Sequence, residues 1–208
     1  MKKLFAVILT VALLLTFTAC GKVGETKKEF SRGVITGNAY ENEFLGLGVE
    51  LGDDWVFYSD EQIATLYGIT TDLLEEDFGE YLKNATVIYD MHAANNVDAS
   101  NIGINFEKLS VLGEVQTANM EVYLTSVMPT VVNSLETIGC TDVSYELCDV
   151  KIGDNTFKGA KTKATMSGIQ LYQMIVCTKC DGYIANITVT SYFTDATQSI
   201  LDRFYSLK

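Results

Sequence analysis

Two cysteines near the end of the chain, Cys177 and Cys180, have the Cys-x-x-Cys spacing of redox pairs and of half a zinc site. A thioredoxin-type pair opens a helix after a strand, whereas here the turn residues Asp181 and Gly182 follow, which indicates a hairpin. Three residues of extended strand span about 10 Å, beyond the reach of a disulfide at about 4.4–6.8 Å between Cα atoms. The spacing therefore argues against a Cys177–Cys180 bond.

The register expected for the neighbouring strands separates two further thiols. Ideal hairpins place Lys158 opposite Cys177 and Gly159 opposite Cys148, so one strand lies between the two cysteines. We expect these thiols to be small core or boundary residues, with a disulfide or a four-cysteine zinc site as the less favoured alternatives. The sequence does not determine the redox state of the four cysteines beyond residue 20, which are Cys140, Cys148, Cys177 and Cys180.

The chain holds one histidine, His92, at the end of a predicted strand. Catalytic triads and most zinc sites place histidine beside a nucleophile or further ligands, so we interpret His92 as a polar boundary residue. No Gly-x-Ser-x-Gly elbow, phosphate-binding glycine loop or His-Glu-x-x-His pair occurs. The sequence thus predicts no catalytic set, no cofactor and no metal site.

Two acidic runs and several tyrosines have an ordinary structural interpretation. Asp53-Asp54 and residues 75–77 lack the alternate spacing of a calcium loop, so we expect a solvated, solubilising surface. The tyrosines at stripe positions of predicted strands and helices are interpreted as core residues, and Trp55 as a core plug. These tyrosines are Tyr40, Tyr123, Tyr145 and Tyr172.

The first residues of the chain have the pattern of a secretory signal. A basic start is followed by an uncharged stretch over residues 4–19, shorter than the roughly 20 residues that span a bilayer. The stretch ends Phe17-Thr18-Ala19-Cys20-Gly21, which resembles a bacterial lipobox. The resemblance implies cleavage before Cys20 and a diacylglyceryl group on its sulfur, which is sufficient for stable anchoring because it supplies two chains. An ordinary signal peptide or a short uncleaved anchor is the alternative.

These features divide the chain into three parts. We expect a lipoprotein signal peptide over residues 1–19, a lipidated Cys20 with a flexible tether over 20–37, and one domain over 38–208. The protein would then be held at the extracytoplasmic face of the cell membrane. Its net charge of -12 argues against nucleic-acid binding and implies repulsion from anionic headgroups, so the domain should stand off the surface.

Residue patterns predict alternating strands and helices along the domain. Ser59 should cap a first helix, and further helices are predicted over residues 71–83 and 116–138. In the last of these Pro129 should kink or break the helix, and Gly139 should end it. Thr194 is expected to cap a final helix with Ile200, Leu201 and Phe204 on its apolar stripe. Strands are predicted over residues 39–42, 45–51, 55–58, 86–92, 101–108, 142–152, 155–166, 170–180 and 183–191.

This order of elements indicates an α+β fold, an antiparallel β-sheet flanked by helices on both faces. The opening of the domain resembles Mog/PsbP-like domains of bacterial lipoproteins, through Tyr40, Asn42, Gly46, Leu47 and Trp55. The resemblance implies an α/β/α sandwich but no metal or partner residues that can be carried over.

The function predicted from the sequence is that of a membrane-anchored binding or accessory module without catalysis, with an envelope protein as a possible partner. The alternative is an extracytoplasmic hydrolase that acts on glycans through two carboxyl groups about 5–9 Å apart. A two-lobed solute-binding lipoprotein is excluded because the domain is too short for two lobes around a hinge.

Overall fold

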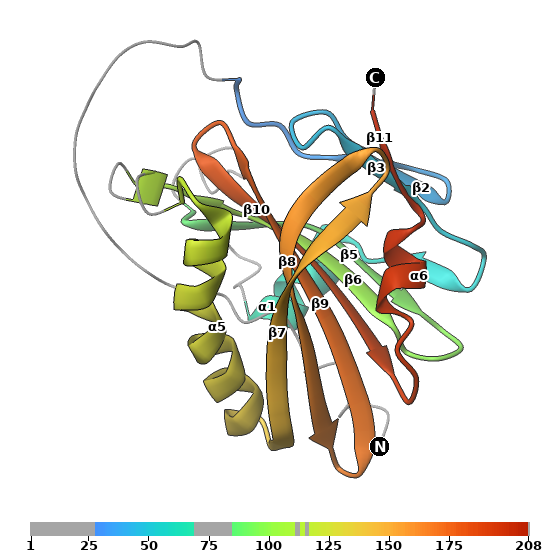
Figure 1. Cartoon of the computed structure of the whole chain (residues 1–208). Helices are drawn as coiled ribbons and strands as arrows, with labels where there is room; N and C mark the ends of the chain where they lie inside the picture. Colours follow the sequence, from blue (N-terminus) through green and yellow to red (C-terminus); the bar gives the residue numbers. More distant parts are fainter. Residues whose placement is uncertain (1–27, 69–84, 111–112, 115–116, 208) are drawn as a thin grey trace.

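The computed structural model describes residues 28–68, 85–110, 113–114 and 117–207, and these form two antiparallel β-sheets with helices packed against them (Figure 1). The larger sheet has seven strands in the order β4-β5-β6-β10-β9-β8-β7. Their bounds are β4 Trp55–Phe57, β5 Val87–Asn95, β6 Asn101–Lys108, β7 Cys140–Ile152, β8 Asn155–Met166, β9 Ile169–Cys180 and β10 Tyr183–Tyr192. The last four, all predicted as strands, pair in chain order as a meander. Its tight turns use pairs such as Asp181-Gly182, both with positive φ, as the hairpin prediction requires.

The smaller sheet has four strands in the order β1-β2-β3-β11. These are β1 Val34–Thr36, β2 Ala39–Asn42, β3 Leu47–Glu50 and β11 Phe204–Ser206. Sequence reasoning predicted β2 and β3 but not the two outer strands, which are only three residues long. Phe204 was expected on the final helix and instead pairs with Val49 in the sheet.

Three helices lie among the described residues. Helix α1, Asp60–Tyr67, starts with the predicted cap: Ser59 accepts from the N–H of Gln62, whose side chain accepts from the N–H of Ser59. Helix α5, Met120–Thr137, is capped by Asn119 and runs through Pro129 without a break. Gly139 follows it with a φ of 94°, as predicted. Helix α6, Thr197–Leu201, has no side-chain cap, so the predicted cap at Thr194 is wrong.

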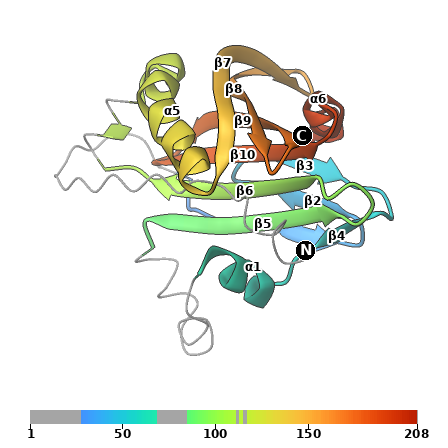
Figure 2. The same ribbon diagram turned by 90° about the horizontal axis from the view of Figure 1, so that it is seen from below.

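Helix α1 lies beside β5 and helix α5 beside β7 (Figure 2), and the contacts of their side chains place both on the same face of the curved large sheet. Tyr67 of α1 stacks on Tyr89 of β5, and Tyr89 lies opposite Asn105 of β6. Asn105 in turn lines a cavity beneath α5, so all three belong to one face. The α+β class and the antiparallel sheet are as predicted. The other face, however, is covered in the described residues by the small sheet and the five-residue α6, rather than by a full helical layer. The helix predicted over 71–83 lies outside the described residues.

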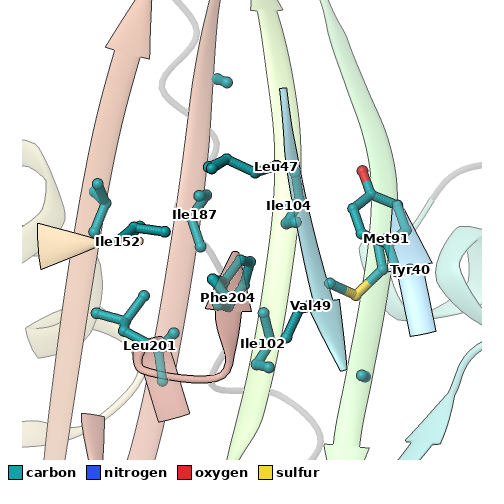
Figure 3. Packing of buried hydrophobic residues seen from close by; sticks show 14 of the residues in the cluster. Tyr40, Leu47, Val49, Met91, Ile102, Ile104, Ile152, Ile187, Leu201 and Phe204 are labelled. Carbon is teal, nitrogen blue, oxygen red and sulfur yellow. The ribbon is translucent and has the colours of Figure 1, made fainter. Parts of the chain in front are cut away.

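The main hydrophobic core fills the space between the two sheets (Figure 3). Tyr40 and Val49 of the small sheet meet Met91 and Ile104 of the large one, and Leu201 of α6 closes the side. All are nearly or completely buried. Strands β8, β9 and β10 also pack against α5 on their other face, so they are covered on both faces over part of their length.

A buried carboxylate ties the start of the described chain to the large sheet. Asp90 lies at a bulge in β5, and its side chain is fully buried. It accepts hydrogen bonds from Arg32 Nε at 3.1 Å, from Gly33 N at 3.0 Å and from Asn42 Nδ2 at 2.9 Å, as well as from the hydroxyl of Tyr40. Residues 28–37, which we expected to belong to the tether, are thus packed against the domain. The predicted tether is left with residues 20–27, which lie outside the described residues.

Candidate functional site

An open groove crosses strands β7, β8 and β9 on the face of the large sheet that also carries the main core. Its volume is about 320 Å³, within the range of roughly 300–1,000 Å³ typical of ligand sites. We name it the Tyr–Lys groove. Its lining residues are Ser144, Tyr145, Glu146, Lys161, Lys163, Tyr172 and Asp195.

The strand register explains how the floor of the groove is built. Lys163 of β8 lies opposite Ser144 of β7 and Tyr172 of β9, and directly opposite residues project from the same face. Two residues along, Lys161 lies opposite Met174, which belongs to the main core. The groove is therefore the continuation of the core-bearing face beyond the small sheet. On this part of the face β8 and β9 carry lysine and tyrosine side chains, whereas the part under the small sheet carries apolar ones.

One wall of the groove is fixed by an ion pair. Lys161 Nζ lies 2.7 Å from Asp195 Oδ2, and the two side chains are 38% and 27% exposed. Burial opposes the ionisation of Asp195, but hydrogen bonds from Lys161 and Thr197 outweigh it and lower its pKa. The hydrogen bond to Asp195 raises the pKa of Lys161 in return. Both groups are consequently charged at neutral pH, and each is satisfied largely by the other.

One tyrosine ring, that of Tyr172, and a second lysine supply the rest of the surface. Tyr172 is half-buried, whereas Tyr145 is exposed (38%) and lies opposite Thr162, so its side chain projects from the other face of the sheet. The ammonium of Lys163 lies 5.8 Å from the centre of the Tyr172 ring, a cation–π distance. The interpretation of these two tyrosines as core residues is therefore wrong, although it holds for Tyr40 and Tyr123, which are buried. The sequence did contain a signal, because Lys161 and Lys163 alternate with the buried Thr162 and Ala164.

A second, much smaller cavity lies beneath α5 on the opposite face. Asn186 of β10 donates to Asn105 of β6 at 3.1 Å and accepts from the thiol of Cys177 at 3.0 Å. Close by, the Tyr123 hydroxyl donates to Glu107 at 3.4 Å; burial raises the pKa of Glu107, and this bond partly offsets the rise. The cavity measures about 30 Å³, which is room for about one water molecule. These polar groups are therefore satisfied mainly by one another.

The structure places the remaining predicted residues away from the groove. His92 lies inside β5, not at its end, and is buried between the rings of Tyr58 and Tyr67. The boundary interpretation is thus wrong, and burial lowers the pKa of His92 to about 4. The predicted register of Cys177 with Lys158 is confirmed, as is that of Cys148 with Gly159. All four of these cysteines are free thiols: Cys140, Cys148, Cys177 and Cys180.

Burial also determines the state of the Cys-x-x-Cys thiols. It raises the pKa of Cys177 to about 12 and that of Cys180 to about 11. Such thiols are protonated at neutral pH and are poor nucleophiles and metal ligands. Among the described residues no cluster of three or more metal-ligating side chains occurs.

The other sequence predictions concern surface and terminal residues. Asp53 and Asp54 are exposed in the turn before β4, as expected for a solvated surface, and Trp55 is buried. Cys20 and the acidic run over residues 75–77 lie outside the described residues. No helix in the described part of the chain is long and apolar enough to span a bilayer.

Comparisons with known proteins give no family. No family model matches the chain, and no curated protein does, so the resemblance to Mog/PsbP-like domains stays a prediction. A structure from Bacteroides thetaiotaomicron aligns with 84% of this chain and 50% of its own length, at 11% identity and a TM-score of 0.41. The chain thus spans about half the length of that protein. LpqN of Mycobacterium tuberculosis, involved in cell envelope biogenesis, aligns over 78% of this chain and 83% of its own, at 9% identity and a TM-score of 0.40.

Proposed function

We propose that this protein is a lipid-anchored extracytoplasmic binding module, and that its Tyr–Lys groove binds a segment of a saccharide. The observation that carries the proposal is the composition of the groove. The half-buried ring of Tyr172 lies beside a hydroxyl, two ammonium groups and two carboxylates in a space of about 320 Å³. Sugars present apolar C–H faces that pack on aromatic rings, and hydroxyl groups that both donate and accept hydrogen bonds.

The shape of the groove favours a chain-like ligand over an enclosed small molecule. The floor is formed by side chains of three neighbouring strands, about 4.8 Å apart, so its length runs across the sheet. The open side allows a polymer to enter and leave. The cavity beneath α5, by contrast, has a volume of about 30 Å³ and cannot hold a sugar ring without movement of the helix.

Binding without catalysis is preferred over glycan hydrolysis because of the carboxyl groups available. A hydrolase needs one carboxyl group that remains protonated to act as the general acid, paired with a second carboxylate. Lys161 holds the pKa of Asp195 low, which is the opposite of what a general acid needs. Glu107, whose pKa is raised, lies on the other face of the sheet, opposite Ile184 in the core beneath α5.

A groove is also favoured over a broad apolar surface for a protein partner. Apart from the adjacent Val34 and Ile35 on β1, the large exposed apolar side chains of the described chain are scattered, for example Val56 on β4, Val97 in a loop and Val122 on α5. An envelope protein that contacts the domain remains a possible partner under this proposal, but these scattered side chains do not define its docking site.

The test of the binding proposal uses the full, lipidated protein in detergent on an array of neutral and acidic glycans. We expect selective retention by a subset of glycans, which Tyr172→Ala abolishes. Tyr205→Ala is the matched control, because Tyr205 lies on β11 of the small sheet, where it bonds to Glu41. Equal binding by wild type and Tyr172→Ala, or no binding by wild type to any glycan, contradicts the proposal.

The anchor is tested separately by Cys20→Ser. A diacylated protein enters the detergent phase on phase separation, because two acyl chains hold it there. We expect the wild type in the detergent phase and the variant in the aqueous phase. A variant that stays in the detergent phase and is retained by membranes rules out anchoring through Cys20.

A further inference from the structure

The two lysines of the Tyr–Lys groove differ in how their charge is balanced. Lys161 is held by Asp195 at 2.7 Å. Lys163 forms no ion pair among the described residues, and its exposed ammonium lies over the Tyr172 ring, 5.8 Å from the centre. An ammonium on an aromatic face is held more weakly than one on a carboxylate, so Lys163 is the group that is free to move to a ligand.

The two direct cross-strand neighbours of Lys163 are uncharged. Its cross-strand neighbours are Ser144 and Tyr172, a hydroxyl and a phenol that can both donate to an anion. The nearest acidic groups that line the groove, Glu146 and Asp195, gather around Lys161, with Glu146 directly opposite Lys161 on β7. An anion at Lys163 therefore meets one positive charge and two neutral donors.

From this arrangement we infer that the groove takes an acidic saccharide, and that Lys163 pairs with a sugar carboxylate. This inference rests on the proposed function. When the ammonium leaves the Tyr172 ring for the carboxylate, it exposes the ring face on which the sugar packs. Lys163 is thus a specificity-determining residue, whereas Lys161 keeps the wall of the groove in place through Asp195.

A carboxylate is preferred over a phosphate because of the number of cationic groups. Phosphate sites combine several charged donors, commonly arginine pairs or a helix N-terminus, to match a larger charge. The groove offers one lysine whose charge is not already neutralised, and the overall charge of the chain is -12. This balance of charges favours an anionic group with a single negative charge.

The experiment measures binding by calorimetry with the full lipidated protein in detergent. The probes are digalacturonate, sialyllactose and the GlcNAc–MurNAc disaccharide, each beside its own methyl ester, which removes the charge and adds one methyl group to each carboxyl. We expect at least one acid to bind wild type about fivefold more tightly than its ester, the size of one exposed ion pair. Raising the salt concentration should reduce that preference.

Three variants assign the preference to Lys163. Lys163→Met should bind acid and ester equally, and Lys163→Arg should keep the preference because it keeps the charge. Lys151→Met is the matched control, since Lys151 is an exposed lysine on β7 that does not line the groove. It should leave the preference unchanged.

The outcomes separate this inference from the proposed function. If every ester binds wild type as tightly as its acid, or if Lys163→Met keeps the preference, the acidic-sugar inference is overturned while saccharide binding stands. If wild type binds no acid, no ester and no glycan on the array, the proposed function fails and the inference fails with it.

Discussion

The carboxylate of Asp90 should contribute more to stability than any exposed charge of this domain, and Asp90→Asn tests this at constant side-chain volume. The side chain of Asp90 is 0% exposed and accepts hydrogen bonds from Arg32, Gly33, Tyr40 and Asn42. An asparagine offers one acceptor oxygen and turns an NH₂ group toward donors. Some of the donors around it therefore lose their partner.

The expected cost follows from the burial of the pair. Removing one partner of a buried ion pair costs about 3–5 kcal/mol. In Asp90→Asn, Arg32 keeps its ion pair with Asp60 at 2.8 Å, and the Arg32 side chain is 21% exposed. We therefore expect the loss of stability to lie at the lower end of this range, about 3 kcal/mol. Asp60→Asn is the matched control, because it removes the other carboxylate of the same arginine. The Asp60 side chain is 56% exposed, and its loss should cost about 0.2–1 kcal/mol.

The assay is urea unfolding of the two variants and the wild type, followed by circular dichroism. An unchanged dependence on denaturant, with a lower midpoint, would show that the loss lies in the stability of the folded state. If Asp90→Asn costs no more than Asp60→Asn, the carboxylate does not hold residues 28–37 and the small sheet against β5 as we describe.

Three further predictions concern packing, acid sensitivity and thiol reactivity. Gly159→Ala should cost about 1–3 kcal/mol in urea unfolding, because its new Cβ would lie 2.8 Å from the Ile175 carbonyl oxygen, whereas Gly52→Ala, with no atom closer than 3.7 Å, should cost far less. His92 has a pKa of about 4 in the folded protein, below its unfolded value near 6.5, so protonation favours unfolding. Protonation of His92 should lower the free energy of unfolding of the wild type by about 3 kcal/mol between pH 6.5 and pH 4. His92→Gln should lack this contribution, and an equal loss in both proteins would contradict the burial of a neutral ring. Cys177, with a pKa of about 12, should resist alkylation at pH 8 until the protein is unfolded, and rapid labelling of the native protein, read by mass spectrometry, would show that the thiol is accessible.

Local patterns were sufficient to predict the strands and turns of the meander. A tight hairpin turn requires positive φ at its two central residues, and Asp181 and Gly182 both have it. The position of this turn sets the register of the strands on either side. The register that places Cys177 opposite Lys158 follows from the turn positions alone. The cap at Ser59 is equally local, since its partner Gln62 is three residues away.

The arrangement of the sheets depends on partners that are distant in sequence. The strand β11 pairs with β3, which lies more than a hundred and fifty residues earlier, and three residues give no periodic pattern of their own. Because its strand partner is so distant, Phe204 was assigned to the apolar stripe of the final helix. The second sheet occupies the face on which we expected helices, and no local signal distinguishes the two coverings.

The groove was missed because exposure depends on where the small sheet ends. Tyr172 and Met174 lie on the same face of β9 and have similar surroundings in sequence. Met174 is covered by the core between the sheets, whereas Tyr172 lies beyond it. Only the position of the covering sheet separates a core residue from a binding residue here. The alternation of Lys161 and Lys163 marks the exposed face but does not say that a hollow is present.

The most direct test of saccharide binding in the groove is an NMR titration that locates the ligand. The full protein carries ¹³C-labelled tyrosine rings, and the glycan retained on the array is added. We predict that the ring signal of Tyr172 shifts as the glycan is added, while that of Tyr205 on the small sheet does not. A titration in which the glycan binds but the Tyr172 ring signal stays unchanged would contradict the assignment of the groove as the binding site.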